Sequence, residues 1–371
     1  MNCKRILTGL LAVSLSLSLT ACTPQNNDAS TSGAASVQNS QETETRIYTD
    51  SLGREVELPV HIDKVALSGP LAQIMLFPLC PDKMVGVAST WSEDAALYLK
   101  EEHYTLPEIG QLYGGKGALN LETLLTSGAQ VVIDVGRPTD GLAEDLDDLQ
   151  NQTGVPFVHI ATTTEETGDT YRMLGELLDM ETEAEVLAEY CDRIYNQTID
   201  LMNSVEKVNA LYITGEDGLN VIPLGSYHSE IIDLMTNNLA VVDNPSSKGT
   251  GNEVDMEQIL LWNPDVIIFS HDSIYDTVAD DPSWQEVSAI ANGRYYEAPY
   301  GPYNWMGNPP SVQRYICMQW LSHILYPEAT SDYDMYEITR EYYELFYHCD
   351  LTQDLYDNLV SRAMGPAESA Q

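Results

Sequence analysis

Short apolar runs alternate with helical stretches in the first half of the chain that follows residue 46. The runs expected to be strands are rich in β-branched residues and lie at 64–68, 84–89, 130–135 and 155–160. The stretches expected to be helices lie between them, at 70–79, 95–101, 121–127 and 141–153. Strands that alternate with helices in this way are typical of parallel βαβ units.

The pattern then changes to that of one long helix. Apolar side chains over 187–205 recur at steps of three, one and four residues, which places them on one helical face. A helix over 183–206 would be roughly 36 Å long, at about 1.5 Å per residue. Thr182 and Glu185 match a capping box at its start. A shorter helix is expected before it, at 165–180.

After the long helix, the alternation of strands and helices resumes. Strands are expected at 209–214, 265–270 and 293–299, and the chain then becomes helical at 311–325 and 333–360. We therefore predict an α/β protein with two similar lobes, each with a parallel-type sheet, joined by one long α-helix. The carboxyl ends of the strands in two such lobes form a natural ligand cleft.

One structural unit occurs twice, once in each lobe. The two segments are LNLETLLTSGAQVVI (119–133) and VDMEQILLWNPDVII (254–268). Asn120 aligns with Asp255 as a helix cap, and Glu122 aligns with Glu257 in the first helical turn. In both segments the helix leads into a buried strand, so the lobes are variations of one α/β unit.

The N-terminus predicts export. Lys4 and Arg5 precede an apolar run at 6–20, which is typical of a secretory signal and too short for a comfortable membrane span. The run ends in Leu-Thr-Ala-Cys, which is similar to the lipobox of bacterial lipoproteins and predicts a lipid on Cys22. The alternative is an ordinary signal peptide with a chance cysteine. The segment that follows is polar and is expected to be a flexible tether. The folded part would then lie outside the cytoplasmic membrane, on the cell surface or in the periplasm.

Charge and cysteine usage exclude some partners. The chain has 57 acidic and 17 basic residues and a formal charge of −40, which argues against a nucleic-acid partner. A local basic patch inside an acidic shell remains compatible with this charge. Four cysteines remain beyond the signal, without a Cys-x-x-Cys motif, so a finger-type zinc cluster is excluded. Whether Cys80, Cys191, Cys317 and Cys349 form a disulfide or stay as buried thiols is left open.

In order along the chain, these features resemble one known family. They are YTDSLGREVELP (48–59), DKVALSGP (63–70), MVGVAS (84–89), the two repeated segments and WQEVSAIANGRYYEAP (284–299). The resemblance is to the substrate-binding lipoproteins of bacterial ABC importers for iron-siderophores, haem and cobalamin, in the helical-backbone class of periplasmic binding proteins. The resemblance covers residues from about 46 to 330. No single motif is decisive, and the resemblance is specific because these motifs occur in order together with the lipobox and the long helix.

The resemblance implies a domain plan. The expected parts are a signal peptide at 1–22, a tether at 23–45, an N-terminal lobe at 46–164, linking helices at 165–207, a C-terminal lobe at 208–330, and C-terminal helices with a tail at 331–371.

The resemblance also implies a function and partners. We expect a monomeric binding protein, and not an enzyme, that has no cofactor of its own. It would capture an iron complex (siderophore or haem) or a corrinoid and deliver it to an ABC permease dimer with its ATPase subunits. Glu122 and Glu257 would pair with arginines on the two permease subunits. Alternatively, both are ordinary first-turn glutamates favoured by the helix dipole.

The ligand site is expected in the loops after the strands. The candidate residues are Ser68, Trp91, Arg137, His228, His271, Tyr300, Tyr303, Trp305, Met306 and Arg314. Aromatic residues among prolines and glycines at 298–311 suit a flat or large ligand, or else pack as local core. Arg137 suits a carboxylate or a catecholate oxygen. Two histidines and Met306 are candidate haem ligands, although a lone histidine is more often only a satisfied polar residue.

Two other functions remain as alternatives. A zinc- or manganese-binding protein of a metal importer needs about three convergent histidines and a carboxylate. Among seven histidines, only His228 and His271 fall in cleft loops. An extracellular hydrolase is less favoured, because neither Gly-x-Ser-x-Gly nor His-Glu-x-x-His occurs. The identity of the metal complex cannot be deduced from the sequence.

Overall fold

The structure is a computed structural model that describes residues 44–112 and 118–366. The expected signal, the lipidation site Cys22 and nearly all of the tether lie outside the described residues. The part from Thr43 onward forms one compact unit. Within the described ranges, no helix has both the length and the apolar character needed to cross a membrane.

The described chain begins with the expected strand pair. Strand β1 (Thr45–Thr49) pairs in antiparallel register with β2 (Glu55–Pro59). The turn between them has Gly53 at φ +79°, a left-handed conformation that favours glycine. The Asp50 carboxylate accepts hydrogen bonds from the backbone N–H groups of Leu52 and Arg54, at 3.0 and 2.9 Å, and so holds the turn.

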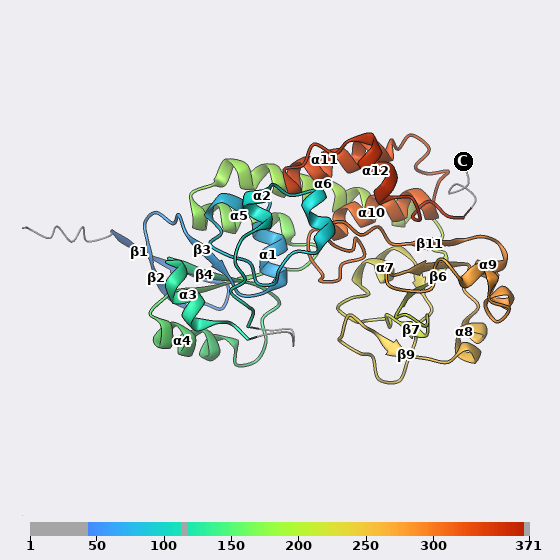
Figure 1. The fold of residues 1–371 in the computed structure, drawn as a ribbon, viewed down its shortest axis with the longest axis horizontal. Coiled ribbons are helices and arrows are strands. Elements are labelled where there is room, and N and C mark those ends of the chain that lie inside the picture. Colours follow the sequence, from blue (N-terminus) through green and yellow to red (C-terminus); the bar gives the residue numbers. More distant parts are fainter. Residues whose placement is uncertain (1–43, 113–117, 367–371) are drawn as a thin grey trace, which may run out of the picture. The chain divides into compact units, whose positions relative to one another are not determined.

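The N-terminal lobe has a parallel sheet. Its strands are β3 (Val65–Leu67), β4 (Val131–Gly136) and β5 (Phe157–Ala161), in the order β3-β4-β5. Its main helices are α1 (Pro70–Leu76), α3 (Leu121–Ser127) and α4 (Leu142–Thr153). Residues of α1 pack on one face of the sheet, and residues of α3 and α4 pack on the other (Figure 1). The predicted parallel βαβ arrangement is confirmed.

Two local predictions in this lobe are wrong. The segment 84–89 forms isolated bridges, not a strand: Met84 pairs with Val65, and Val87 pairs with Glu108. Pro107 supplies a carbonyl to this segment but has no N–H, so the ladder cannot continue. The expected helix at 95–101 is divided into a 3-10 turn, η2 (Glu93–Leu97), and a single turn, α2 (Glu101–Tyr104). A further 3-10 turn, η1, spans Pro81–Lys83.

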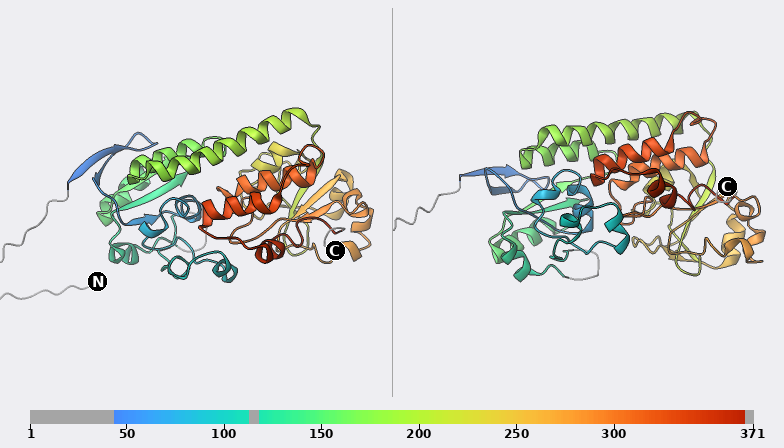
Figure 2. Two further views of the ribbon diagram at one scale, coloured as in Figure 1. Left: turned by 90° about the horizontal axis from the view of Figure 1, so that it is seen from above. Right: turned by 45° about the horizontal axis from the view of Figure 1, so that its top comes forward.

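Two packed helices connect the lobes. Helix α5 (Thr167–Leu178) leads through a left-handed Asp179 into α6 (Glu181–Ser204), which has 24 residues (Figure 2). The predicted long helix is confirmed. The predicted capping box is wrong, because the helix begins at Glu181 without a side-chain cap. The Glu185 carboxylate instead accepts two hydrogen bonds from Arg172 of α5, both at 2.9 Å.

The C-terminal lobe has a mixed sheet in the order β11-β10-β6-β7-β9, with β8 also paired to β6. Its strands are β6 (Asn209–Thr214), β7 (Asn220–Val221), β8 (Asn237–Asn238), β9 (Asn252–Glu253), β10 (Val266–Phe269) and β11 (Tyr295–Glu297). Its helical elements are α7 (Glu230–Met235), α8 (Met256–Trp262), η3 (Val278–Asp280), η4 (Trp284–Glu286) and α9 (Ser288–Ala291). The expected strands β6, β10 and β11 are confirmed and run parallel.

The repeated unit has the same local structure in both lobes. Asn120 caps α3 by accepting from Thr123 N at 3.0 Å, and Asp255 caps α8 by accepting from Gln258 N at 2.8 Å. Both helices end in a left-handed residue, at φ +72° and +41°, before β4 and β10. The sequence repeat is therefore a structural repeat. Glu122 and Glu257 both lie exposed in the first turn of their helices.

The C-terminal region contains α10 (Gln313–Leu325), α11 (Met335–Tyr347) and α12 (Gln353–Leu359). Nearly every residue of α10 is buried, because α6, α7 and α11 all pack against it. The stretch predicted as helical over 333–360 is divided by His348, which adopts a left-handed conformation at φ +52°. The core shared by these helices is continuous with both lobes.

Candidate functional site

Contacts between the lobes converge on Arg314 in the first turn of α10. Its Nη1 atom donates to Thr164 Oγ1 of the N-terminal lobe at 2.9 Å and to Glu230 Oε2 of the C-terminal lobe at 2.7 Å. Its Nη2 atom donates to the Tyr227 carbonyl at 2.5 Å. The neighbouring Tyr315 hydroxyl donates to the Thr164 carbonyl at 2.5 Å. One guanidinium thus binds both walls of the inter-lobe cleft.

Arg314 is a buried cation. Its side chain is only 3% exposed, and this burial lowers its pKa, while the nearby Glu230 carboxylate opposes the shift. Gly307 makes room for it, since a Cβ there would lie 2.8 Å from Arg314 Nε. The Nε atom has no hydrogen-bond partner among the described residues. A guanidinium stays protonated in proteins, so this position carries a permanent positive charge.

A second guanidinium group, that of Arg137, lies near Arg314 and against the same aromatic ring, that of Tyr227. Arg137, in the loop after β4, is 4.9 Å from the centre of the Tyr227 ring, and Arg314 is 5.2 Å from it. Arg137 Nη2 also lies 3.4 Å from Glu230 Oε2, and its side chain is half exposed. Two cations therefore meet one carboxylate and one aromatic ring, which gives a basic position inside a strongly acidic chain.

A small cavity of about 10 Å³, roughly the room for one water molecule, adjoins this cluster. It is lined by Leu71, Met75, Thr162, Thr163, Thr164, Thr167, Tyr227, Pro310, Ser311, Arg314 and Tyr315. The buried Ser311 hydroxyl finds no hydrogen-bond partner in the part of the chain that the structure describes. A buried cation and a hydroxyl without a partner therefore lie beside a cavity with room for about one water, so a larger ligand requires the surrounding side chains to move.

Aromatic residues form a second contact between the lobes. The Tyr303 hydroxyl accepts from Gln73 Nε2 of α1 at 2.9 Å, and its ring lies 5.4 Å from that of Trp91. Burial raises the Tyr303 pKa. The buried Trp91 Nε1 has no partner within the described ranges. Tyr303 is partly exposed, whereas Trp91 is buried.

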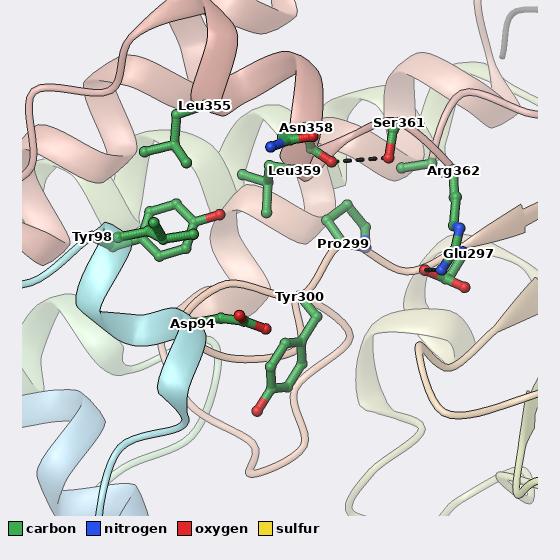
Figure 3. Close-up of a pocket in the computed structure, with 12 residues that line it drawn as sticks. Asp94, Tyr98, Glu297, Pro299, Tyr300, Leu355, Asn358, Leu359, Ser361 and Arg362 are labelled. Carbon is green, nitrogen blue, oxygen red and sulfur yellow. Dashed lines mark hydrogen bonds and ion pairs between the residues drawn. The ribbon is translucent and has the colours of Figure 1, made fainter.

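A larger cavity of about 330 Å³ opens near α12 (Figure 3). Asp94 of η2 and Tyr98, which directly follows η2, line one side of it. Glu297 and Arg362 form an ion pair at its other side, 3.5 Å apart. Burial raises the pKa of Glu297, and Arg362 opposes this shift. Tyr300 also lines this cavity and stacks on His271, with ring centres 3.9 Å apart.

Some predicted ligand residues lie in the core. Trp305 and Met306 are each 1% exposed, so the structure differs from the expectation of open aromatic faces on this loop. Trp305 Nε1 donates to the Tyr343 hydroxyl at 3.3 Å, and Met306 Sδ lies 3.3 Å from Cys317 Sγ. Helices α10 and α11 cover this part of the loop, and the local sequence does not reveal these contacts.

Ser68 also points away from the cleft. Its hydroxyl donates to the Asp134 carboxylate, which in turn binds His159 Nδ1 at 2.6 Å, and all three side chains are buried. The candidate haem ligands are placed in different surroundings. Met306 packs on Cys317, His271 stacks on Tyr300, and His228 has a pKa lowered first by burial and then by Arg314.

The sequence provides little signal for several residues of the site. Glu230, Thr164 and Gln73 belong to no motif, and Glu230 is one of 57 acidic residues. Tyr227 is identifiable only as a loop residue after β7. Among the residues that the structure describes, no group of three or more His, Cys, Asp or Glu side chains could hold a metal ion. The four cysteines in these ranges are free thiols.

Comparison with known families identifies the class. A family model described as "Periplasmic binding protein" matches residues 80–300, so the chain belongs to that family. The protein is a solute-binding protein of an ABC importer, a class that works with a permease and an ATPase. The family implies a location outside the cytoplasm, and the relatives are binding proteins, not enzymes.

Two named relatives are similar in sequence. The molybdate-binding protein MolA of Haemophilus influenzae is 24% identical over 340 residues, covering 83% of this chain and 93% of that protein. The Fe(3+)-citrate-binding protein YfmC of Bacillus subtilis is 27% identical over 140 residues, covering 37% of this chain and 43% of that protein.

Solved structures share the fold. An ABC transporter solute-binding protein from Sulfurospirillum deleyianum matches with a TM-score of 0.77 at 25% identity, covering 85% of this chain and 98% of that one. A periplasmic solute-binding protein from Veillonella parvula matches with a TM-score of 0.72 at 24% identity, covering 85% and 97%.

Proposed function

We propose that the protein captures an anionic ferric complex outside the cell membrane and delivers it to an ABC permease. The carrying observation is that Arg137 and Arg314 both lie against the Tyr227 ring and both contact Glu230, where the two lobes meet. In this proposal the ligand's negatively charged oxygens bind the guanidinium groups, and its body lies against Trp91 and Tyr303.

The chemistry of these side chains supports this cargo. Guanidinium groups bind carboxylate and catecholate oxygens through paired, charge-assisted hydrogen bonds. Aromatic faces add contact area for a flat or bulky ligand. A strongly acidic chain repels free anions at long range, so an anionic ligand needs such a local pair of cations.

A molybdate-type oxyanion is the second candidate. The relative with this ligand in its name aligns with 83% of the chain, and the other named relative binds ferric citrate. Both ligands are negatively charged, which agrees with a site built on two arginines. Haem held by Met306 is no longer favoured, because that side chain is buried.

Anchoring and docking complete the proposal. Cys22 would carry the lipid that holds the protein at the membrane. Glu122 and Glu257 would dock on the two permease subunits, because they occupy equivalent exposed positions in the two lobes.

The test is a calorimetric titration of the purified chain with a panel of ligands. The panel contains ferric citrate, a ferric catecholate, a ferric hydroxamate, haem, cobalamin, molybdate, and Zn²⁺ and Mn²⁺ alone. We expect the tightest binding for a ferric complex that carries net negative charge. Tightest binding of a neutral complex, a corrinoid or a bare cation would overturn the anionic assignment.

A matched pair of variants tests the site. Arg193 provides the control, because it lies 4.9 Å from the Tyr190 ring and binds Glu341 at 2.7 Å, remote from the cleft. Arg137→Gln should weaken ligand binding roughly tenfold, the size of one charge-assisted hydrogen bond, while Arg193→Gln should leave it unchanged. Equal effects of the two variants would reject the proposed site.

A further inference from the structure

Glu230 is the carboxylate that both arginines of the cleft share. Its Oε2 atom lies 2.7 Å from Arg314 Nη1 and 3.4 Å from Arg137 Nη2. It stands in the first turn of α7, and its side chain is 27% exposed. A protein carboxylate thus occupies the position where two guanidinium groups converge.

We propose that Glu230 is a specificity-determining residue that occupies the place of the cargo's anionic group. Cargo binds when an oxyanion with at least two oxygens, such as a carboxylate or a tetrahedral oxoanion, replaces this carboxylate between Arg137 and Arg314. Neutral solutes and monatomic anions are excluded, because they cannot replace both contacts. This inference rests on the proposed function, in which these arginines bind the cargo.

The charges at the site favour such an exchange. Two guanidinium groups face one carboxylate, so a net positive charge remains to attract an anion. Glu230 is tethered, so its carboxylate competes at a high effective concentration. A ligand that makes a single weak contact therefore cannot displace the Glu230 carboxylate. A ligand that also reaches other hydrogen-bond donors can displace it. Arg314 Nε and Ser311 Oγ are buried and have no partner among the described residues, and in this proposal they become such donors once the Glu230 carboxylate has moved away.

The displacement requires only side-chain movement. Glu230 lies at the start of a six-residue helix and is partly exposed, so its carboxylate can rotate towards solvent while the backbone stays in place. The next turn is anchored independently, because the Ser229 hydroxyl donates to Asp233 at 2.6 Å. Arg137 is half exposed and can follow a ligand oxygen, whereas the buried Arg314 stays fixed by Thr164 and the Tyr227 carbonyl.

The experiment compares Glu230→Gln with Glu341→Gln in the full chain. Both variants remove one negative charge from an ion pair with an arginine, and Glu341 pairs with Arg193 away from the cleft. Ferric citrate, molybdate, acetate and chloride are the probes in calorimetric titrations. We expect Glu230→Gln to bind ferric citrate or molybdate roughly tenfold tighter than the wild type and to gain binding of acetate. Glu341→Gln should match the wild type.

The two oxygen-rich probes separate the possible sources of the anionic group. A gain for ferric citrate assigns the site to carboxylate-bearing complexes, and a gain for molybdate assigns it to tetrahedral oxoanions. Equal or weaker binding of every probe by a folded Glu230→Gln variant would overturn the proposal, as would the same gain in Glu341→Gln.

A stability measurement covers the case of a poorly folded variant. Removing Glu230 leaves the buried Arg314 with fewer partners, so Glu230→Gln is expected to unfold at a lower temperature. A probe anion should then raise the unfolding temperature of this variant more than that of the wild type, and Glu230→Asp should respond less. Absence of this difference would reject the role of Glu230.

The outcomes also separate this inference from the proposed function. If the wild type binds an anionic cargo and Glu230→Gln binds it no better, only the specificity role fails. If the wild type binds no anionic cargo but Glu230→Gln binds ferric citrate or molybdate, the result supports the specificity role of Glu230 and rejects the cargo assigned under the proposed function.

Discussion

Arg314 and Thr164 belong to opposite lobes, and Arg314 Nη1 donates to Thr164 Oγ1 at 2.9 Å. The two residues are 150 positions apart in the chain. The adjacent Tyr315 hydroxyl binds the Thr164 carbonyl, so side chains of α10 hold the loop after β5 at two points. The inter-lobe cleft is therefore closed at this point by specific polar contacts.

Removal of the Thr164 hydroxyl should weaken this closure. Thr164→Val leaves a buried guanidinium hydrogen without its acceptor, so we expect a loss of about 1–3 kcal/mol in the free energy of unfolding. Chemical denaturation measures this loss. Thr198→Val is the control, because the Thr198 hydroxyl is also buried and, among the described residues, binds only the Ile194 carbonyl within α6. Equal losses of unfolding free energy in both variants would show that the contact between the lobes adds no more stability than a hydrogen bond within one helix.

Tyr343 of α11 should stabilise the loop at 298–311. Its hydroxyl accepts from Trp305 Nε1 at 3.3 Å and donates to the Gly301 carbonyl. Tyr343→Phe leaves both groups buried without this partner, and we expect it to cost about 1–3 kcal/mol of unfolding free energy.

Tyr171 provides a matched comparison for Tyr343. It is also fully buried, but its hydroxyl has no hydrogen-bond partner among the described residues. Tyr171→Phe should therefore be neutral or stabilising, because it removes a desolvated hydroxyl that gains nothing in return. A larger loss for Tyr171→Phe than for Tyr343→Phe in the same denaturation experiment would contradict this account.

Docking on the permease is expected to depend on Glu122 and Glu257 together. The double variant to alanine should bind ligand like the wild type but should reduce transport into cells or proteoliposomes more than about tenfold, since each lost charge pair weakens the complex. Glu181→Ala is the control, because Glu181 is an exposed first-turn glutamate of α6. Transport at the wild-type rate by the double variant would show that neither glutamate is needed for docking on the permease.

Thiol reactivity should follow burial. Burial raises the pKa of Cys80 to about 12 and raises the pKa values of Cys191 and Cys317 above their ordinary range. Cys349 is half buried and its pKa is also raised by burial, so all four are mainly protonated at neutral pH.

The pH dependence of alkylation has a clear sign. Only the thiolate reacts, so labelling should be slow at pH 7 and should accelerate as the pH rises. Iodoacetamide labelling followed by mass spectrometry should modify Cys349 first in the folded protein, with Cys80 modified only after unfolding. Rapid labelling of Cys80 at pH 7 would show that the core around it opens.

Local signals in the sequence explain the success of several predictions. The capped helices α3 and α8 were predictable because Asn120 and Asp255 hydrogen-bond to backbone groups three residues away. The length of α6 followed from a helical repeat of apolar side chains. The parallel sheet of the N-terminal lobe and the parallel strands β6, β10 and β11 followed from strands alternating with helices, whereas the antiparallel β7 and β9 were not predicted.

Predictions failed where distant residues decide the local structure. Thr182 and Glu185 satisfy the pattern of a capping box, but Arg172 of the preceding helix binds Glu185 instead. The apolar run at 84–89 has the composition of a strand, but Pro107 in the neighbouring segment cannot continue the ladder.

The sequence by itself determined the class of fold, the repeated unit and the position of the cleft, because these depend on hydrophobic periodicity and capping within a few residues. Only the tertiary structure decided which side chains face that cleft. Trp305 is buried against Tyr343 of α11, and Met306 is buried against Cys317 of α10. Glu230 and Thr164 reach Arg314 from opposite lobes. The free energy of such contacts depends on neighbours far apart in the chain, which no local pattern records.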